Sequence, residues 1–160
     1  MSNRLPHGVI YDKDQAKQSS AEIGWVFLCS NRTLEECLVR KLFGSPKRDW
    51  RRVSQVKKGD TAYLLNYETN HLYGVFEEVT NGAMNLETDA FGGYFPAQVR
   101  VVTKMKAPPA SKGALLPLIK KGWIRVSKRE IFLFPHKLGP KFVNALWSFH
   151  VKSMSSENLM

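Results

Sequence analysis

The order of strand-like and helix-like segments is the feature that most constrains the fold of this chain. An apolar, β-branched and aromatic run at residues 23–29 is followed by one helical pattern and then by strand patterns with no helix between them. Those strand patterns occupy residues 61–67, 72–79 and 94–103. The order lacks the regular βαβ alternation of a doubly wound nucleotide-binding fold. It predicts an α+β fold, a small mixed β-barrel with a few short flanking helices.

The helical pattern has signals at both of its ends. Thr33 and Glu36 have the spacing of a capping box, and Gly44 with Pro46 is expected to stop the helix. Its apolar positions recur at helical spacing, at Leu34, Cys37, Leu38 and Leu42. The strand patterns at 61–67 and 72–79 are close enough along the chain to form a hairpin, and Pro96 confines the start of the third to an edge or a bulge.

The C-terminal third has weaker patterns. Residues 115–121 favour a short helix, whereas residues 123–126 and 131–134 fit either strand or extended coil. Pro140, followed by apolar residues at helical spacing, predicts a closing helix. The chain is expected to divide into a flexible arm (1–22), a single domain (23–152) and a frayed tail (153–160).

Charge is segregated along the chain, whose formal net charge is +10. Residues 40–58 hold eight basic and one acidic side chain, and residues 104–152 hold eleven and one. Residues 59–103 hold one basic and six acidic side chains. If the fold brings the basic blocks to one side, the protein gains a basic face for an anionic partner. The alternative is that each block is an ordinary solvated surface.

The sequence argues against secretion, membrane spanning and catalysis. There is no signal-peptide pattern and no run of 18 apolar residues, so the sequence predicts an intracellular protein, cytoplasmic or nuclear, without membrane contact. Cys29 and Cys37 are then expected to be reduced, packed thiols, and their spacing gives no support for zinc. The histidines are scattered, and no HExxH, GxSxG or P-loop motif occurs. The chain is expected to be non-catalytic and to need no metal or cofactor.

Basic and aromatic residues are interleaved in RKLFGSPKRDWRRV, residues 40–53. This mixture suits single-stranded or looped RNA better than duplex grooves, because phosphates need cations and unpaired bases need aromatic faces. Trp50 either stacks on a base or anchors its loop by packing. The candidate nucleic-acid contacts are Lys47, Arg48, Trp50, Arg51 and Arg52, extended by Lys120, Lys121, Arg125, Lys128 and Arg129.

Three blocks of the chain resemble the DCD (development and cell death) domain. They are GWVFLCSNRTLEECLVRKLFGSP, AYLLNYETNHLYGVFEE and NLETDAFGGYFPAQVRVV, which follow one another with matching spacing. The resemblance implies a PUA-like fold related to EVE and YTH modules, which bind nucleic acid and in some cases hold a modified base in an aromatic pocket. It also implies the family's link to plant stress responses and programmed cell death. The alternative function is therefore a protein-interaction adaptor, with its contact on the acidic middle or a sheet edge.

The resemblance also implies a candidate base pocket. In the related base-reading modules an aromatic after the first helix forms one wall, and Phe43 matches that position; the alternative is that Phe43 packs in the core. Ser30 and Asn31 would offer hydrogen bonds to the base edge. The full candidate lining is Ser30, Asn31, Phe43, Gly44, Ser45 and Arg100.

Two further expectations concern the acidic middle of the chain. Arg100, its only basic residue, either pairs with a carboxylate such as Glu77 or Glu78 or points into the pocket. The signature-loop residues are expected to shape the backbone rather than to contact a ligand. They are Asn85, Phe91, Gly92, Gly93 and Tyr94. RNA or single-stranded nucleic acid is the expected partner, and the base, the pathway and the oligomeric state stay open.

Overall fold

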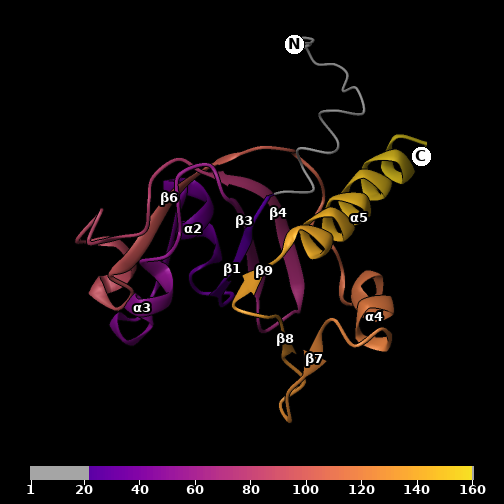
Figure 1. The fold of residues 1–160 in the computed structure, drawn as a ribbon, viewed down its shortest axis with the longest axis horizontal. Coiled ribbons are helices and arrows are strands. Elements are labelled where there is room, and N and C mark those ends of the chain that lie inside the picture. The colour runs from indigo at the N-terminus through magenta and orange to yellow at the C-terminus, as the bar shows by residue number, and fades with distance from the viewer. Residues whose placement is uncertain (1–21, 160) are drawn as a thin grey trace.

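A central sheet lies between two groups of helices in the computed structural model, which describes residues 22–159, with side chains through residue 152 (Figure 1). The first half contains β1 (Gly24–Cys29), α2 (Leu34–Arg40), β2 (Leu42–Ser45), η1 (Lys47–Asp49), α3 (Trp50–Val53), β3 (Thr61–Asn66) and β4 (His71–Glu78). The second half contains β5 (Ala83–Met84), η2 (Ala90–Gly93), β6 (Ala97–Thr103), α4 (Lys112–Lys120), β7 (Arg125–Val126), β8 (Phe132–Leu133), β9 (Lys137–Leu138) and α5 (Pro140–Leu159).

The main sheet is mixed and open. Its strand order is β2-β6-β4-β3-β1-β9, with β5 paired to β6 beside this path. β1 runs parallel to β3, and the expected hairpin is the antiparallel pair β3–β4. Among the described strands, no ladder joins β2 to β1 or to β9. The α+β class is thus confirmed, whereas closure of the sheet into a barrel is not.

Strand β3 separates two hydrophobic cores, and all six of its residues are buried. Because side chains alternate along a strand, Ala62 and Leu64 pack with the core that contains α2 and β2. Tyr63 and Leu65 pack with the other core, which includes residues of α4 and α5. Figure 1 shows the same arrangement, with α2 and α3 on one side of the sheet and α4 and α5 on the other.

The ends of α2 differ from those expected. Thr33 makes no side-chain cap; its hydroxyl instead accepts a hydrogen bond from the Ser30 backbone N–H at 3.1 Å. The Glu36 carboxylate accepts a hydrogen bond from the Phe91 backbone N–H at 2.8 Å. This donor, which is distant in the sequence, takes the place of the backbone N–H at the start of the helix that a capping box would use. The helix ends at Arg40, and Lys41 adopts a left-handed conformation with φ 53°. The predicted capping box and the predicted stop at Gly44 and Pro46 were therefore wrong.

The remaining elements match the expectations with shifted boundaries. β6 begins at Ala97 because Pro96 has no N–H for a ladder, and the short helix begins at Lys112, earlier than expected. The two ambiguous segments form the antiparallel pair β7–β8, so the strand alternative holds. α5 begins at Pro140 as predicted. The division into arm, domain and tail stays a prediction, since most of the arm lies outside the described residues.

Both cysteines are free and buried, as predicted for packed thiols. Burial, with a smaller contribution from Glu68, raises the pKa of the Cys29 thiol to about 12. Burial likewise raises the pKa of Cys37 to about 12, with Cys29 and Glu36 adding to the effect. Neither thiol is a ready nucleophile, because the thiolate is the reactive form.

Glu78, at the end of β4, is a buried carboxyl group. The residue is fully buried, and neither carboxyl oxygen has a hydrogen-bond partner among the described residues. Burial, followed by the charge of Asp60, raises the pKa of this carboxyl well above its ordinary value. A group whose pKa is higher in the folded state favours folding at low pH, and that contribution is lost as the pH rises through the folded pKa.

Replacing Glu78 by glutamine should therefore stabilise the protein more as the pH rises. The advantage of Glu78→Gln over the native chain is expected to grow by about 1.4 kcal/mol for each pH unit between the unfolded and folded pKa values of Glu78. Urea denaturation from pH 5 to pH 8 measures the difference, and Glu77→Gln on the same strand is the matched control. A difference that stays constant with pH would show that Glu78 is ionised in the folded state.

Candidate functional site

The open side of the sheet, between β1 and β2, contains a pocket of about 220 Å³. β1 pairs with β3 along its whole length, but on its other side it pairs with β9 only at Gly24 and Trp25. The ends of β1 and β2 therefore stay separate, and residues from both strands line the cavity between them. We call this cavity the seam pocket. Its lining is Leu28, Cys29, Ser30, Thr33, Gly44, Ser45, Pro46, Arg48, Asp49, Arg52, Tyr67 and Phe95.

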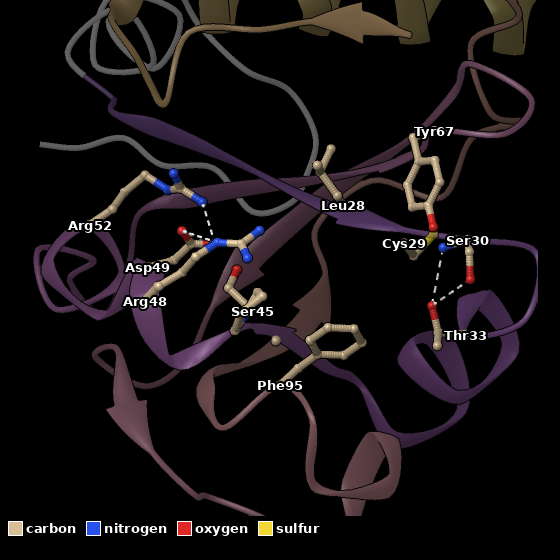
Figure 2. Close-up of a pocket in the computed structure, with 12 residues that line it drawn as sticks. Leu28, Cys29, Ser30, Thr33, Ser45, Arg48, Asp49, Arg52, Tyr67 and Phe95 are labelled. Carbon is tan, nitrogen blue, oxygen red and sulfur yellow. Dashed lines mark hydrogen bonds and ion pairs between the residues drawn. The ribbon is translucent and has the colours of Figure 1, made fainter. Parts of the chain in front are cut away.

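Apolar and aromatic faces form much of the seam pocket. Leu28 belongs to the largely buried strand β1, yet it is 55% exposed. Tyr67 directly follows the buried strand β3, and it is 40% exposed. Phe95 comes from the loop before β6 and packs against Phe91, with their ring centroids 5.8 Å apart. In Figure 2, the Phe95 ring lies between the arginines at one end of the pocket and Tyr67 at the other. These faces provide surfaces on which a planar ring can stack.

Gly44 permits the close approach of Phe95 to β2. A Cβ atom at Gly44 would lie 2.8 Å from the Phe95 carbonyl oxygen and 3.1 Å from the Phe95 Cβ. Any larger residue at Gly44 would displace the loop that carries Phe95. The glycine of the LFGSP block therefore positions an aromatic wall that comes from a distant part of the chain.

Hydroxyl groups supply the polar part of the seam pocket. Ser30 and Thr33 lie at one end, where the Thr33 hydroxyl accepts from the Ser30 N–H and the Ser30 hydroxyl accepts from the Arg32 N–H at 3.2 Å. Ser45 is 6% exposed and lies beside Phe95 (Figure 2). Serine and threonine hydroxyls both donate and accept hydrogen bonds, so they can pair with the edges of different bases.

Two arginines and one aspartate form the cationic end of the seam pocket. Arg48 has an 82% exposed side chain, and its Nε lies 3.9 Å from a carboxylate oxygen of Asp49. Arg52 contacts the same carboxylate at 3.3 Å, and its guanidinium lies 3.1 Å from Nδ1 of His136. One carboxylate cannot neutralise two guanidinium groups, so this end keeps a net positive charge. The contact with His136 also brings the first basic block against the C-terminal part of the chain.

The structure separates the predicted pocket residues into two groups. Ser30, Gly44 and Ser45 line the seam pocket. Phe43 is fully buried and packs against Phe27 and Phe76, with ring centroids 5.9 Å and 5.1 Å apart. Of the two alternatives for Phe43, packing in the core is therefore the one found. The Phe43 ring belongs to the core that also contains Leu42 and Phe27, so it is not available to a ligand in the seam pocket.

Asn31 and Arg100 are used elsewhere in the fold. The Asn31 side-chain oxygen accepts from the Asn66 amide at 2.8 Å. Arg100 donates to the Glu87 carboxylate at 2.6 Å and to the Arg40 carbonyl oxygen at 3.1 Å. Hydrogen bonds from Arg100 and then Arg40 lower the pKa of Glu87. Arg100 thus has a structural partner, but the expected partners Glu77 and Glu78 were wrong.

The other basic candidates lie outside the seam pocket. Lys47, Trp50 and Arg51 belong to η1 and α3 beside it, and all three are exposed. The candidates from the second basic block lie at the end of α4 and on the β7–β8 hairpin, which projects away from the main sheet (Figure 1). These candidates are also exposed; they are Lys120, Lys121, Arg125, Lys128 and Arg129. Their role in binding stays a prediction.

The signature loop shapes the backbone as expected, and the residue that follows it, Phe95, supplies a wall of the seam pocket that the sequence did not reveal. Positive φ angles occur at Asn85, Phe91, Gly92 and Gly93. Phe95 and Tyr67 were missed as site residues. The only sequence signal for Phe95 was its place directly after this loop, and Tyr67 had the appearance of a strand residue.

Within residues 22–159, no group of three or more His, Cys, Asp or Glu residues is placed to hold a metal ion. Of the helices in that range, none combines the length and the apolar character needed to cross a membrane.

Comparison with solved structures shows a shared fold. The chain superimposes on an RNA complex of the YTH domain-containing protein mmi1 with a TM-score of 0.62 and 13% identity, covering 88% of each chain. It also matches the YTH domain of the Zygosaccharomyces rouxii MRB1 protein, in complex with N6-methyladenosine RNA. That match has a TM-score of 0.58 and 14% identity, and covers 81% of this chain and 86% of the other.

Comparison of sequences identifies the family. The chain is 36% identical over 103 residues to the DCD domain-containing protein NRP of Arabidopsis thaliana. The aligned region covers 60% of this chain and 30% of the relative. It is also 36% identical over 103 residues to the B2 protein of Daucus carota, covering 60% of this chain and 50% of the relative. The family model described as "Development and cell death domain" matches residues 23–148. The chain therefore belongs to the development and cell death domain family.

Proposed function

We propose that this chain is a non-catalytic module that binds single-stranded RNA at the seam pocket. One unstacked base enters the pocket between the aromatic and aliphatic faces, and the adjacent phosphates contact Arg48 and Arg52. The single observation that carries the proposal is the composition of the pocket, in which stacking faces, hydroxyl groups and uncompensated arginines surround one cavity. The RNA complexes described for YTH domains of the same fold support it.

The size and the lining of the seam pocket favour one base, with or without an added methyl group. Leu28 and Phe95 are apolar, so a methylated base would bury its methyl group there without leaving a polar group unpaired. The hydroxyls of Ser30 and Ser45 can serve as hydrogen-bond partners for the base edge. We infer a pocket that selects for an unpaired base, because a base inside a duplex cannot enter it.

The test is a fluorescence anisotropy titration of a labelled ten-nucleotide single-stranded RNA pool of random sequence. If three or four phosphates meet cations, raising the salt from 50 mM to 200 mM should weaken binding roughly 20- to 50-fold. Arg48→Glu should weaken binding and flatten this dependence, because a phosphate contact is lost. Lys152→Glu, the same charge change on α5, is the matched control. Absence of binding at 50 mM salt would end the proposal.

A second candidate function, a protein-interaction adaptor, is favoured by a separate apolar hollow. It has a volume of about 270 Å³ and includes Phe76, Met105 and the 40% exposed Val102. Pull-down with and without nuclease separates the two functions, because partners held through RNA are lost on digestion. The sequenced relatives are longer than the matched region, so their whole-protein roles need not be those of this domain.

A further inference from the structure

The seam pocket continues into a second hollow. Ser30, Thr33, Tyr67 and Phe95 line both cavities, so the two are parts of one cleft. The second part has a volume of about 560 Å³, and its additional lining includes Tyr94. We call it the tyrosine hollow. It lies at the end of the cleft away from Arg48 and Arg52, which line only the seam pocket.

The signature loop presents Tyr94 to solvent at the tyrosine hollow. Phe91, Gly92 and Gly93 have consecutive φ angles of 55°, 61° and 83°, a turn that is disfavoured for a bulky residue such as phenylalanine. The Phe91 N–H is held by the Glu36 carboxylate at 2.8 Å. After this turn Phe95 faces the seam pocket, whereas Tyr94 is 77% exposed.

Gly92 lies beside the Tyr94 ring. A Cβ atom at Gly92 would lie 3.5 Å from that ring, an ordinary van der Waals distance, so with glycine at this position no side chain of residue 92 covers the ring. A large aromatic ring with most of its surface in solvent offers an open face for stacking. Tyr94 and Phe95 thus give two neighbouring parts of one cleft an aromatic surface each.

The charges around the tyrosine hollow favour a base over a phosphate. Glu36 and Glu68 line it together with Arg32. Both carboxylates accept backbone hydrogen bonds, from Phe91 and from Asn31 at 2.7 Å, and Glu36 is also paired with Arg40 at 2.9 Å. With two carboxylates and one arginine in its lining, the hollow lacks the excess of positive charge that a phosphate needs. The phosphate-binding end of the cleft is therefore the end with Arg48 and Arg52.

We propose that the cleft holds two successive nucleotides, with one base in the seam pocket and the next base stacked on Tyr94. This inference rests on the proposed function and extends it. It makes a dinucleotide the smallest ligand that fills the cleft, and it assigns Tyr94 a direct contact with the second base. The phosphates lie toward the Arg48 end, and the second base lies over the acidic wall of the tyrosine hollow.

The test compares ligands of increasing length against variants of Tyr94. Isothermal titration calorimetry is performed with three ligands: a mixture of the four nucleoside monophosphates, a random-sequence pool of dinucleotides and a random-sequence pool of eight-nucleotide RNA. The dinucleotide should bind the native chain about tenfold more tightly than the mononucleotide, because one additional base is stacked. Tyr94→Ala should remove that gain, so that the dinucleotide binds no more tightly than the mononucleotide. Tyr94→Phe, which keeps the ring without the hydroxyl, should retain it.

The outcomes distinguish this inference from the function on which it rests. If RNA binds but Tyr94→Ala weakens all lengths equally, or weakens none, the second stacking position does not exist. If the native chain binds no RNA of any length, the proposed function fails first and this inference with it. Leu116→Ala, at an exposed apolar residue on α4, controls for nonspecific loss of apolar surface.

Discussion

Replacing Phe43 by alanine is expected to lower the free energy of unfolding by about 3–5 kcal/mol. Phe43 is fully buried, and its ring packs against Phe27 and edge-on against Phe76. Alanine would remove these contacts and leave a cavity between β2 and the rest of the core, which the rigid strands can fill only in part. Urea denaturation monitored by fluorescence and by circular dichroism measures the loss.

A milder variant separates packing from binding at the same position. Phe43→Leu removes fewer buried atoms than Phe43→Ala and leaves a smaller cavity, so it is expected to reduce the free energy of unfolding by less. The core position also predicts that Phe43→Leu binds RNA as the native chain does. If Phe43→Leu kept native stability but lost RNA affinity, Phe43 would instead have to be part of the pocket wall.

The local pattern of the sequence was sufficient for most elements of the fold. β1, the β3–β4 hairpin, α4 and α5 all follow from apolar periodicity and from proline positions such as Pro140. The failures involve competition from distant partners. Glu36 had the spacing of a capping residue, but the Phe91 N–H, far along the chain, takes its carboxylate. A local pattern cannot reveal such a donor.

The candidate site was only partly predictable for the same reason. Ser30, Gly44 and Ser45 lie on segments whose order could be read directly, and all three line the seam pocket. The aromatic wall, Phe95, reaches the pocket only because β6 pairs with β2 and because a left-handed turn precedes it. Pairing between distant strands is set by the whole core, so the family resemblance, which matches one local segment at a time, suggested Phe43 instead.

The open edge between β1 and β2 also depended on the three-dimensional arrangement. The strand count and order favoured closure of the sheet, but β9 pairs with only the first two residues of β1. The remaining edge of β1 borders a cavity rather than another strand. The gap that keeps the sheet from closing into a barrel is therefore also the place where the candidate site lies.

Replacing Phe95 by alanine is expected to weaken binding of single-stranded RNA between about tenfold and a hundredfold. The Phe95 ring is the aromatic face on the loop side of the seam pocket, and a base that enters the pocket loses its stacking partner when the ring is removed. Phe95 is only partly buried, so its loss should reduce stability less than Phe43→Ala does. Phe95→Tyr preserves a stacking face and should retain most of the affinity.

The most direct test of the RNA site is an anisotropy titration of Phe95→Ala beside Phe43→Leu, with the same single-stranded RNA pool at 50 mM salt. Both variants remove one aromatic ring near Gly44, but Phe43 packs against Phe27 in the core, whereas Phe95 lines the seam pocket. A site at the seam predicts a large loss of RNA affinity for Phe95→Ala and native affinity for Phe43→Leu. Equal affinity of Phe95→Ala and the native chain would contradict RNA binding at the seam pocket.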